Sequence, residues 1–273
     1  MVFLNKMDTA TQPVQTVLEA LQTNSDLPLV LRQVPIADGE NNTGYVDLVS
    51  ARAYKYKPGE ASDLISIPDA FADDGQMARQ VMLEALADFD DSLLEKLLED
   101  VVPATDEVYE QMSKDLKEGL IVPVFLGAAE QEHGVRRLLK ALRHETPGPD
   151  DSAMRLGIET KGETVAHVFK TLHAAQAGKL SITRIWRGAV SEGDNMSGTR
   201  VGSVLKLMGN QQKKESKGGL GNVVALGRMD QVLTGDILTP SGKIPEYVKT
   251  IPSPLTPVYS FAIQAENRDD EVK

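Results

Sequence analysis

Apolar residues in the first half of the chain occur either as short continuous runs or at helical spacing. Residues 2–4, 29–31 and 121–126 form short apolar runs, which are typical of buried strands. Residues 9–24 and 134–144 carry apolar side chains three or four positions apart, which predicts amphipathic helices. The order of strand, helix, insertion, strand and helix predicts the last part of an α/β sheet.

The insertion spans about residues 36–120 and has a pattern of its own. A turn is expected at Asn41-Asn42, followed by a further strand. Pro68 opens a helical region with two apolar strips, and shorter helices are expected near 91–99 and 104–118. The sequence therefore predicts a largely helical subdomain inserted into the α/β unit.

Beyond the segment 147–152, the pattern changes to short β-rich runs separated by glycines. Proline and glycine in this segment argue against a continuing helix, so we expect a domain boundary there. Runs of this kind lie at 164–172, 179–186, 201–208 and 222–226. They predict a small antiparallel β-barrel over 151–250, with a bulge or a strand buried on both faces near Thr183. The run 258–265 predicts the first strand of a third domain that begins near residue 251.

Asn5-Lys6-Met7-Asp8 follows the first apolar run and carries the clearest chemical signal. A carboxylate at Asp8 can accept hydrogen bonds from the N1 and N2 groups of guanine, a pair of donors that adenine lacks. The stem of Lys6 can cover the flat face of the base, and Asn5 can tie the loop to neighbouring backbone. The tetrapeptide therefore predicts a guanine-reading loop.

Gly127-Ala128-Ala129 follows the later apolar run and predicts a second loop at the same site. Small residues there would let a backbone N–H approach the base carbonyl oxygen. An ordinary strand-to-helix turn is the alternative explanation of this segment taken alone. Together with the first loop, it makes Asn5, Lys6, Asp8, Ala128 and Ala129 the candidate nucleotide-binding residues.

The chain contains no phosphate-binding segment of the form G-x-x-x-x-G-K-[ST]. Its glycine-rich stretch at 217–222 lacks the final Gly-Lys-Ser/Thr, and the valine-rich run after it predicts a strand. We therefore expect that this chain binds guanine nucleotide weakly or not at all. For the same reason we assign no catalytic residue and expect no GTP hydrolysis by this chain alone.

Composition narrows the classes of protein that the chain fits. The formal net charge of −11 argues against broad adhesion to nucleic acid, which calls for a basic surface. No apolar stretch approaches the roughly 18 residues of a membrane span, so no membrane association is expected. The absence of cysteine excludes disulfides and thiolate metal sites and is compatible with a cytoplasmic location.

The order of these motifs resembles bacterial elongation factor G over essentially the whole chain. Residues 5–8 resemble its guanine loop, and the insertion before Gly127 resembles its inserted subdomain. The glycine-punctuated runs from 178 to 238 resemble its second domain, a β-barrel, and 257–263 resembles the entry to its third domain. Two departures are Ala128, where the family usually carries serine, and a less basic segment at 264–268.

This resemblance implies the tail of a GTP-binding domain over 1–150, followed by a β-barrel and the start of a third domain. It implies a parent protein that binds GTP or GDP with magnesium, hydrolyses GTP on the ribosome and drives movement of tRNA and mRNA. A ribosomal-protection or other specialised GTPase with this architecture is the first alternative. A non-catalytic ribosome-binding module is the second.

Two charged surfaces are candidate contacts with the ribosome. An acidic set on the inserted helices comprises Glu84, Asp88, Asp90, Asp91, Glu95, Glu99 and Asp100, with Lys96 nearly alone among them. The resemblance implies that this subdomain meets the basic carboxy-terminal domain of the ribosomal stalk protein; a solvated helix face is the alternative. A basic set in the barrel comprises Arg184, Arg187, Arg200, Lys206, Lys213, Lys214 and Lys217, which could contact phosphates of small-subunit RNA.

The remaining residues offer little further chemistry. His167 and His173 lie in one predicted strand without carboxylates at ligand spacing, so no metal site is expected. His133 lies beside the second loop, where a loop-filling role is the simpler explanation. Trp186 is expected to anchor the barrel, half buried with its indole N–H satisfied.

Overall fold

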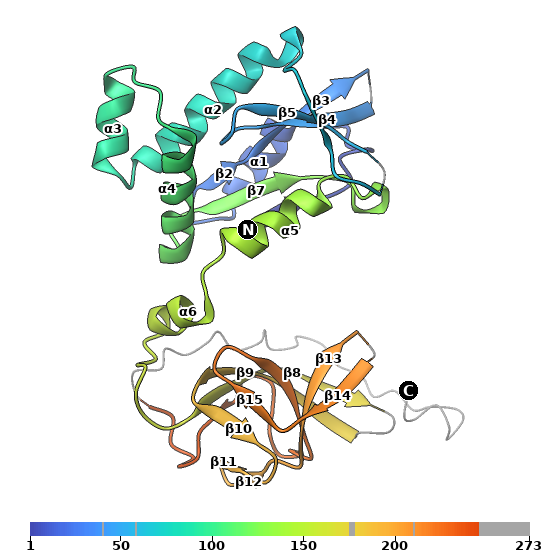
Figure 1. The fold of residues 1–273 in the computed structure, drawn as a ribbon, viewed down its shortest axis with the longest axis vertical. Helices are drawn as coiled ribbons and strands as arrows, with labels where there is room; N and C mark the ends of the chain where they lie inside the picture. Colours follow the sequence, from blue (N-terminus) through green and yellow to red (C-terminus); the bar gives the residue numbers. More distant parts are fainter. Residues whose placement is uncertain (40, 58, 175–177, 210, 246–273) are drawn as a thin grey trace. The chain divides into compact units, whose positions relative to one another are not determined.

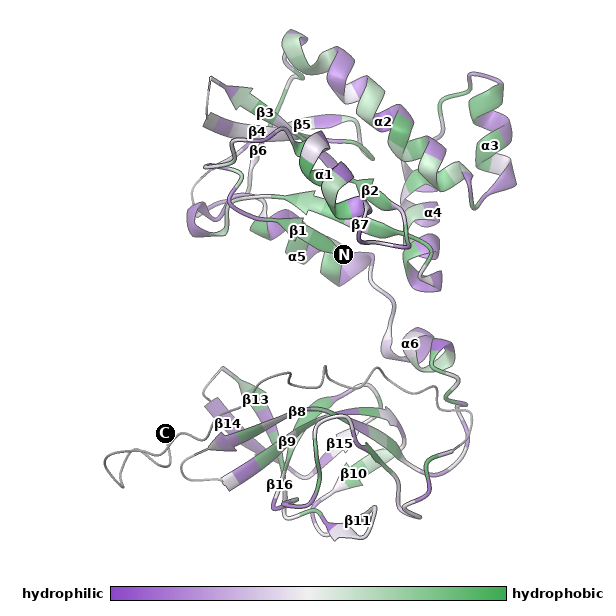
Figure 2. Cartoon of the chain, turned by 180° about the vertical axis from the view of Figure 1, so that it is seen from behind, coloured by the Kyte–Doolittle hydropathy of each residue, from purple (hydrophilic) through white to green (hydrophobic). Residues whose placement is uncertain are grey.

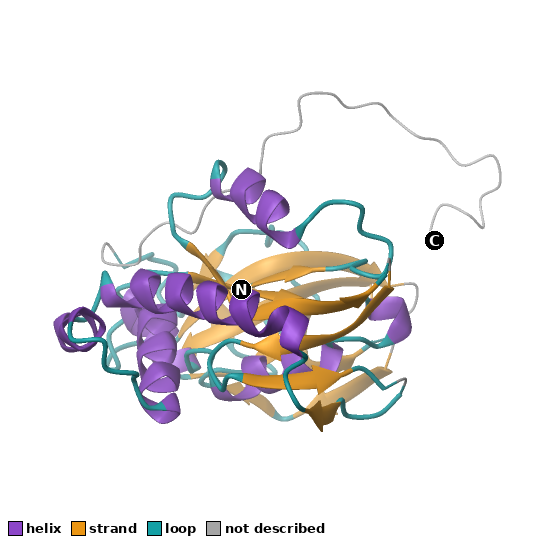
Figure 3. Cartoon of the chain, turned by 90° about the horizontal axis from the view of Figure 1, so that it is seen from above, coloured by secondary structure: helices purple, strands orange, loops and turns teal. Residues whose placement is uncertain are grey.

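The computed structural model describes the chain except for residues 40, 58, 175–177, 210 and 246–273. The chain separates into two compact units, which divide between Pro147 and Gly148. Helices α1 to α5 belong to the first unit, whereas the second consists mainly of strands (Figure 1). Figure 3 colours the helices purple and the strands orange. The strand expected at 258–265, and with it the third domain, lies outside the described residues.

A three-stranded parallel sheet organises the first unit. Its order is β1-β7-β2, formed by β1 (Val2–Leu4), β7 (Val122–Leu126) and β2 (Leu29–Leu31). The central strand β7 is apolar along its length in Figure 2, and Val124, Phe125 and Leu126 are fully buried. α1 (Val14–Gln22) follows β1, and α5 (Val135–His144) follows β7. The strands and helices predicted at these positions are thus confirmed.

The insertion begins with a four-stranded antiparallel sheet. Its strands, in spatial order, are β3 (Gln33–Asp38), β4 (Asn41–Asp47), β5 (Arg52–Lys55) and β6 (Asp63–Ile65). The turn expected at Asn41-Asn42 is wrong, because both residues lie in β4 and pair with β3. Gly44 is a strand residue where backbones approach closely: a Cβ there would lie 2.2 Å from the Tyr54 carbonyl oxygen.

Helices complete the insertion, with bounds close to those expected. They are η1 (Asp69–Phe71), α2 (Ala72–Ala87), α3 (Asp91–Leu98) and α4 (Thr105–Glu118). Of the two apolar strips on α2, the one with Met82 and Leu86 is buried in the core. The other remains at the surface, with Met77 and Val81 exposed by 71% and 60%. The side chain of Asp90 caps α3 by accepting from the Leu93 N–H at 3.0 Å.

The second unit opens with a helix where the sequence predicted none. α6 (Pro149–Arg155) begins with proline at its first position, where the missing N–H costs no hydrogen bond. Asp151 at the third position accepts from the Gly148 N–H at 3.0 Å. As expected, this segment does not continue α5, which ends at His144; a new helix can begin in it because proline disfavours a helix interior but not a helix start.

A six-stranded antiparallel sheet follows in the order β14-β13-β16-β9-β8-β17. Its strands are β8 (Val165–Ala174), β9 (Gly178–Arg187), β13 (Ser203–Met208), β14 (Gln211–Glu215), β16 (Val223–Gly227) and β17 (Ile237–Leu238). Two further pairs join β10 (Ala189–Ser191) to β15 (Lys217–Gly219) and β11 (Asn195–Met196) to β12 (Thr199–Arg200). The valine-rich run after the glycine-rich stretch is strand β16, as predicted.

Strand β9 lies between β8 and β16 and is buried on both faces near its middle. Ser181 and Thr183 are fully buried although both are polar. Pairing with β8 shifts register between Val165 and Ala166 and again between Val168 and Lys170. The irregularity predicted near Thr183 is therefore confirmed.

Two side chains of β9 differ from their expected roles. Trp186 is half buried, but its indole N–H finds no acceptor among the described residues; its ring lies instead 5.4 Å from the Arg184 guanidinium. Arg187 is buried and donates to the carbonyls of Glu163, Glu159 and Lys161. It therefore braces the chain before β8 and is not available to an RNA phosphate.

Candidate guanine-nucleotide site

The two candidate loops meet because the strands before them are parallel neighbours. Leu4 of β1 lies beside Leu126 of β7, so the segments that follow the two strands leave the sheet at the same edge. The Gly127 N–H donates to the Leu4 carbonyl and the Met7 N–H donates to the Gly127 carbonyl, both at 3.0 Å. These bonds continue the ladder beyond the strands and hold the loops side by side.

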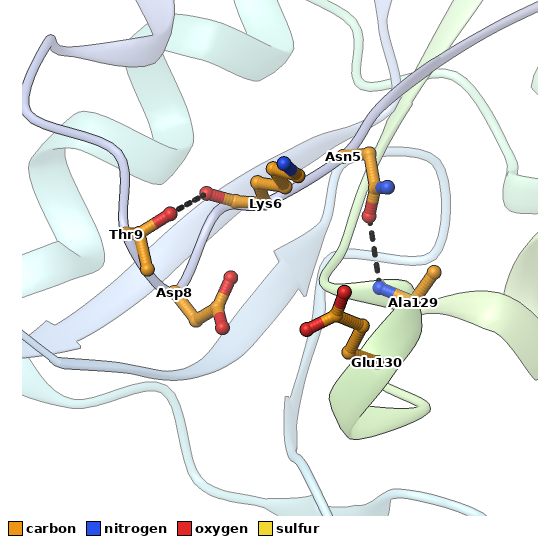
Figure 4. A pocket seen from close by; sticks show the side chains of 6 residues that line it. All are labelled: Asn5, Lys6, Asp8, Thr9, Ala129 and Glu130. Carbon is orange, nitrogen blue, oxygen red and sulfur yellow. Dashed lines mark hydrogen bonds between the residues drawn. The ribbon is translucent and has the colours of Figure 1, made fainter.

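Asn5 links the loops through its side chain. Its Oδ1 accepts from the Ala129 N–H at 2.8 Å, the backbone tie expected of this residue (Figure 4). Lys6 adopts a left-handed backbone conformation with φ of 59°. The N–H and the hydroxyl of Thr9 both donate to the Lys6 carbonyl, at 3.1 and 3.3 Å. The first loop is therefore a tight turn that holds the Asp8 side chain near the second loop.

A cavity of about 150 Å³ lies between the loops, lined by Asn5, Lys6, Asp8, Thr9, Ala129 and Glu130. The carboxylates of Asp8 and Glu130 face the space between the loops in Figure 4. Asp8 is half buried and forms no hydrogen bond or ion pair with another described residue. No salt bridge within the described chain occupies its oxygens. They can therefore accept hydrogen bonds from a ligand.

The second loop differs from expectation in one respect. Ala128 is only 3% exposed and does not line the cavity; its N–H donates to the His133 carbonyl at 3.1 Å. Ala129 lines the cavity, but its N–H is bound by Asn5. A backbone contact to a base carbonyl oxygen would thus require one of these bonds to open.

Sequence reasoning missed Thr9 and Glu130 as lining residues. Thr9 directly follows Asp8 and Glu130 directly follows Ala129, so their position next to a predicted residue was the signal that could have found them. Glu130 enters the cavity because η2 (Ala129–Gln131) turns the chain immediately after Ala128. The cavity therefore contains two carboxylates and one ammonium.

The shape of the second loop depends on Gly127 and on the ring of His133. A Cβ on Gly127 would lie 2.3 Å from the His133 carbonyl oxygen and 2.5 Å from the Phe3 ring. His133 stacks on Tyr56 with ring centroids 4.3 Å apart. This packing supports the loop-filling role predicted for His133.

A buried ionic network joins β4 to α5 and to the residue after it, Glu145. Arg32 is fully buried and contacts Glu145 at 2.5 Å, while Arg137 contacts Asp47 at 2.9 Å and Glu145 at 3.4 Å. The Phe125 ring lies 5.2 Å from the Arg32 guanidinium and 5.4 Å from that of Arg137. Burial alone would raise the pKa of Asp47, but Arg137 and Arg32 outweigh it and hold that pKa below its ordinary value.

Comparison with known proteins identifies the relatives of this chain. No protein-family model matches it. An elongation factor G-like protein of Synechocystis sp. is 46% identical over 277 residues, which cover 100% of this chain and 40% of that protein. By sequence, the chain belongs to the elongation factor G family. Elongation factor G 1 of Borreliella burgdorferi is 30% identical over 246 residues, covering 83% of this chain and 35% of that protein.

A solved structure shares the fold of this chain. The crystal structure of a protein from Thermus thermophilus matches 99% of this chain and 40% of that chain, with a TM-score of 0.78 and 27% identity. The two relatives by sequence confirm the family resemblance seen in the motifs. The chain spans about 40% of the length of the Synechocystis elongation factor G-like protein.

The described chain offers few other sites. No group of three or more histidine, aspartate or glutamate side chains gathers at metal-binding distance within it. His167 is buried in the sheet and pairs with Ile237, and burial lowers its pKa. Among the described helices, none has both the length and the apolar character that a bilayer span requires.

Proposed function

We propose that this chain supplies the guanine-reading loops of an elongation factor G-type GTPase, which promotes GTP-dependent movement of tRNA and mRNA in the cytoplasm. The observation that carries the proposal is the uncommitted Asp8 carboxylate in a cavity shared with Asn5, Lys6 and Ala129. Such a carboxylate accepts from the two adjacent donors of guanine and discriminates against adenine. Family membership supports this assignment.

The architecture is assigned accordingly. The first unit is the tail of a GTP-binding domain with an inserted subdomain over about 36–120, and the β-rich second unit is the barrel domain. GTP, GDP and magnesium are ligands of the whole protein, since this chain lacks the P-loop that holds phosphates and metal. We accordingly expect no GTP turnover by the purified chain.

Base recognition is tested on the chain itself with nucleosides, which need no phosphate site. Two-dimensional NMR spectra are recorded during titrations with guanosine, inosine and adenosine at millimolar concentration. We expect guanosine to shift the amide signals of Asn5, Lys6, Asp8 and Ala129. Inosine lacks the exocyclic amine and should act more weakly, and adenosine should leave these signals unchanged.

Substitutions at Asp8 make the test specific. Asp8→Ala should remove the guanosine response, because both acceptors are lost. Asp8→Asn should transfer the response to xanthosine, whose C2 oxygen accepts where guanine donates. Glu130→Gln is the matched control, since it removes a carboxylate from the same cavity and leaves intact the Asp8 oxygens that are proposed to accept from guanine. Equal responses to guanosine and adenosine, or a guanosine response that survives Asp8→Ala, would contradict the proposal.

The acidic set of the insertion is the proposed contact for the basic domain of the ribosomal stalk protein. Glu84, Asp88, Asp91, Glu95, Glu99 and Asp100 are all exposed. Asp90 caps α3 and pairs with Lys114 at 3.6 Å, whereas Lys96 pairs with Glu107, so the six exposed carboxylates carry most of the charge of the set. Attraction of this kind weakens with salt. If the stalk domain does not bind measurably, or if its binding does not change with salt concentration, the proposed contact is wrong.

In the second unit, the proposed RNA contact rests on a smaller basic set than the sequence suggested. Arg200, Lys206, Lys213, Lys214 and Lys217 are exposed, and Lys206 lies opposite Lys213 in the β13-β14 pair. Lys214 pairs with Glu192 at 2.7 Å and Lys213 with Glu215 at 3.5 Å, so part of their charge is already compensated. Neutralising Lys213 and Lys214 should weaken ribosome association of the whole protein; unchanged association argues against the contact.

A further inference from the structure

A second, larger cavity in the first unit has a chemistry that the guanine site does not explain. It measures about 510 Å³, within the range of small-molecule sites. We call it the basic–aromatic pocket and define it by Arg52, Tyr54, Tyr109, Arg136, Arg137 and Lys140. These residues come from β5, α4 and α5, so the pocket lies where the inserted subdomain meets the last helix of the α/β unit.

Positive charge predominates in this pocket, in contrast to the chain as a whole. Its lining contains four cationic side chains and two carboxylates, while the chain carries a net charge of −11. One of the carboxylates, Asp47, is already engaged, because it is 2% exposed and accepts from Arg137, from the Ser50 N–H and from the Ser50 hydroxyl. The other, Asp106, is exposed in the first turn of α4.

Of the four cationic side chains of the pocket, some are held in place by protein acceptors and others form no ion pair with a described residue. Arg137 is fixed at the base of the pocket by Asp47, and its Nη2 has no hydrogen-bond acceptor among the described residues. Arg136 donates to the Gly59 carbonyl at 2.8 Å, and Lys140 lies four residues further along the same face of α5. Arg52 and Lys140 form no ion pair within the described chain, so their charge is available to a ligand.

Aromatic rings form the rest of the wall. Tyr54 is half buried and stacks on Tyr45, with centroids 5.2 Å apart, so one ring of this pair supports the other at the pocket. Tyr109 is half buried on the neighbouring helix α4. A ring held in this way offers a flat surface on which a planar group can stack. Ser50 and Ser62 also line the pocket, and the Ser50 hydroxyl already donates to Asp47 at 3.0 Å.

The geometry points to a binding site for a small phosphorylated molecule that carries a planar ring, as a mononucleotide does, at the basic–aromatic pocket. Arg52, Arg137 and Lys140 bind the phosphate, because guanidinium and ammonium groups match phosphate oxygens in charge and donor geometry. The ring stacks against the tyrosines. The pocket is built from residues other than those around Asp8, so it binds independently of the guanine site.

Calorimetric titration of the chain with AMP tests this inference, because adenine does not match the donor pattern that Asp8 accepts. We expect one AMP per chain with a dissociation constant of about 1 mM or below. Ribose 5-phosphate, which lacks the ring, and adenosine, which lacks the phosphate, should each bind several-fold more weakly. Asp8→Ala should leave AMP binding unchanged, which separates this site from the guanine site.

The double variant Arg52→Ala/Lys140→Ala should weaken AMP binding about tenfold or more. Its matched control is Lys55→Ala/Arg143→Ala, which removes two exposed cations from the same strand and helix without touching the pocket lining. Circular dichroism verifies that both variants are folded. Absence of saturable AMP binding overturns the inference. So does an equal loss in both double variants, which would indicate attraction by total charge, or ribose 5-phosphate binding as tightly as AMP.

Discussion

Asp115 in α4 provides a sharp test of how burial and charge set the stability of the first unit. Its side chain is fully buried; Oδ1 accepts from Gln111 at 2.8 Å, and Oδ2 has no partner among the described residues. Burial raises the pKa of Asp115 from 3.8 to about 6, with Lys114 opposing the shift. At neutral pH the chain therefore holds a buried carboxylate at a cost in free energy.

The pKa shift gives the size and the sign of this cost. An increase from 3.8 to about 6 corresponds to about 3 kcal/mol, at 1.36 kcal/mol for each unit. The folded state binds the proton more tightly than the unfolded state. The favourable contribution is thus complete below pH 3.8 and is lost as the pH rises through about 6. Asp115→Asn keeps the acceptor for Gln111 and removes the charge, so it should stabilise the first unit by up to about 3 kcal/mol at pH 7.5.

Urea unfolding at a series of pH values measures this effect. Far-ultraviolet circular dichroism reports mainly on the helices of the first unit, whereas the single tryptophan, Trp186, reports on the second by fluorescence. A gain of that size raises the urea midpoint of the first transition by roughly 1 to 3 M. Glu110→Gln is the control, because Glu110 is an exposed acid on the same helix and should change neither transition.

The pH profile distinguishes this explanation from a general effect of the substitution. The advantage of Asp115→Asn should shrink as the pH falls through about 6 and disappear only below pH 3.8, where the wild-type carboxyl is protonated in both states. The fluorescence transition of Trp186 should stay unchanged throughout. A variant that is less stable than wild type at pH 7.5, or one whose advantage does not depend on pH, would refute the reasoning.

Two further predictions concern the ionic network and the second loop. Glu145→Ala should destabilise the first unit by about 3 to 5 kcal/mol, because it leaves the fully buried Arg32 without its carboxylate. Urea unfolding followed by circular dichroism measures the loss of stability. A loss below about 1 kcal/mol would contradict the prediction. Gly127→Ala should shift the second loop, because its Cβ would meet the His133 carbonyl and the Phe3 ring. NMR should then show displaced amide signals at Asn5 and Ala129 and a weaker guanosine response, whereas Gly39→Ala, at a turn with nothing within 4 Å of a Cβ, should leave the site unchanged.

Local patterns determined most elements of this chain. Apolar spacing located α1, α4, α5 and β7, and strands β8, β9, β13 and β16 of the second unit, because an element must bury one face whatever surrounds it. The sequence also pointed to residues 5–8, of which Asn5, Lys6 and Asp8 line the smaller cavity, since Asn-Lys-x-Asp behind an apolar run is a local signal. It failed at Asn41-Asn42 and at Pro149, where turn-forming and helix-breaking residues lie inside a strand and at the start of a helix. Both residue types are compatible with more than one local structure, and pairing with distant chain decides between them.

Only the tertiary structure decided what each polar side chain does. Arg187 and Arg184 are alike in sequence, yet one is buried against carbonyls before β8 and the other lies half buried beside Trp186. Ala128 and Ala129 are identical and adjacent, but only Ala129 faces the cavity. The cations of the basic–aromatic pocket come from residues 52 to 140 and carry no shared motif. Partners far apart in the chain determine burial, hydrogen bonding and local charge, and folding alone brings them together.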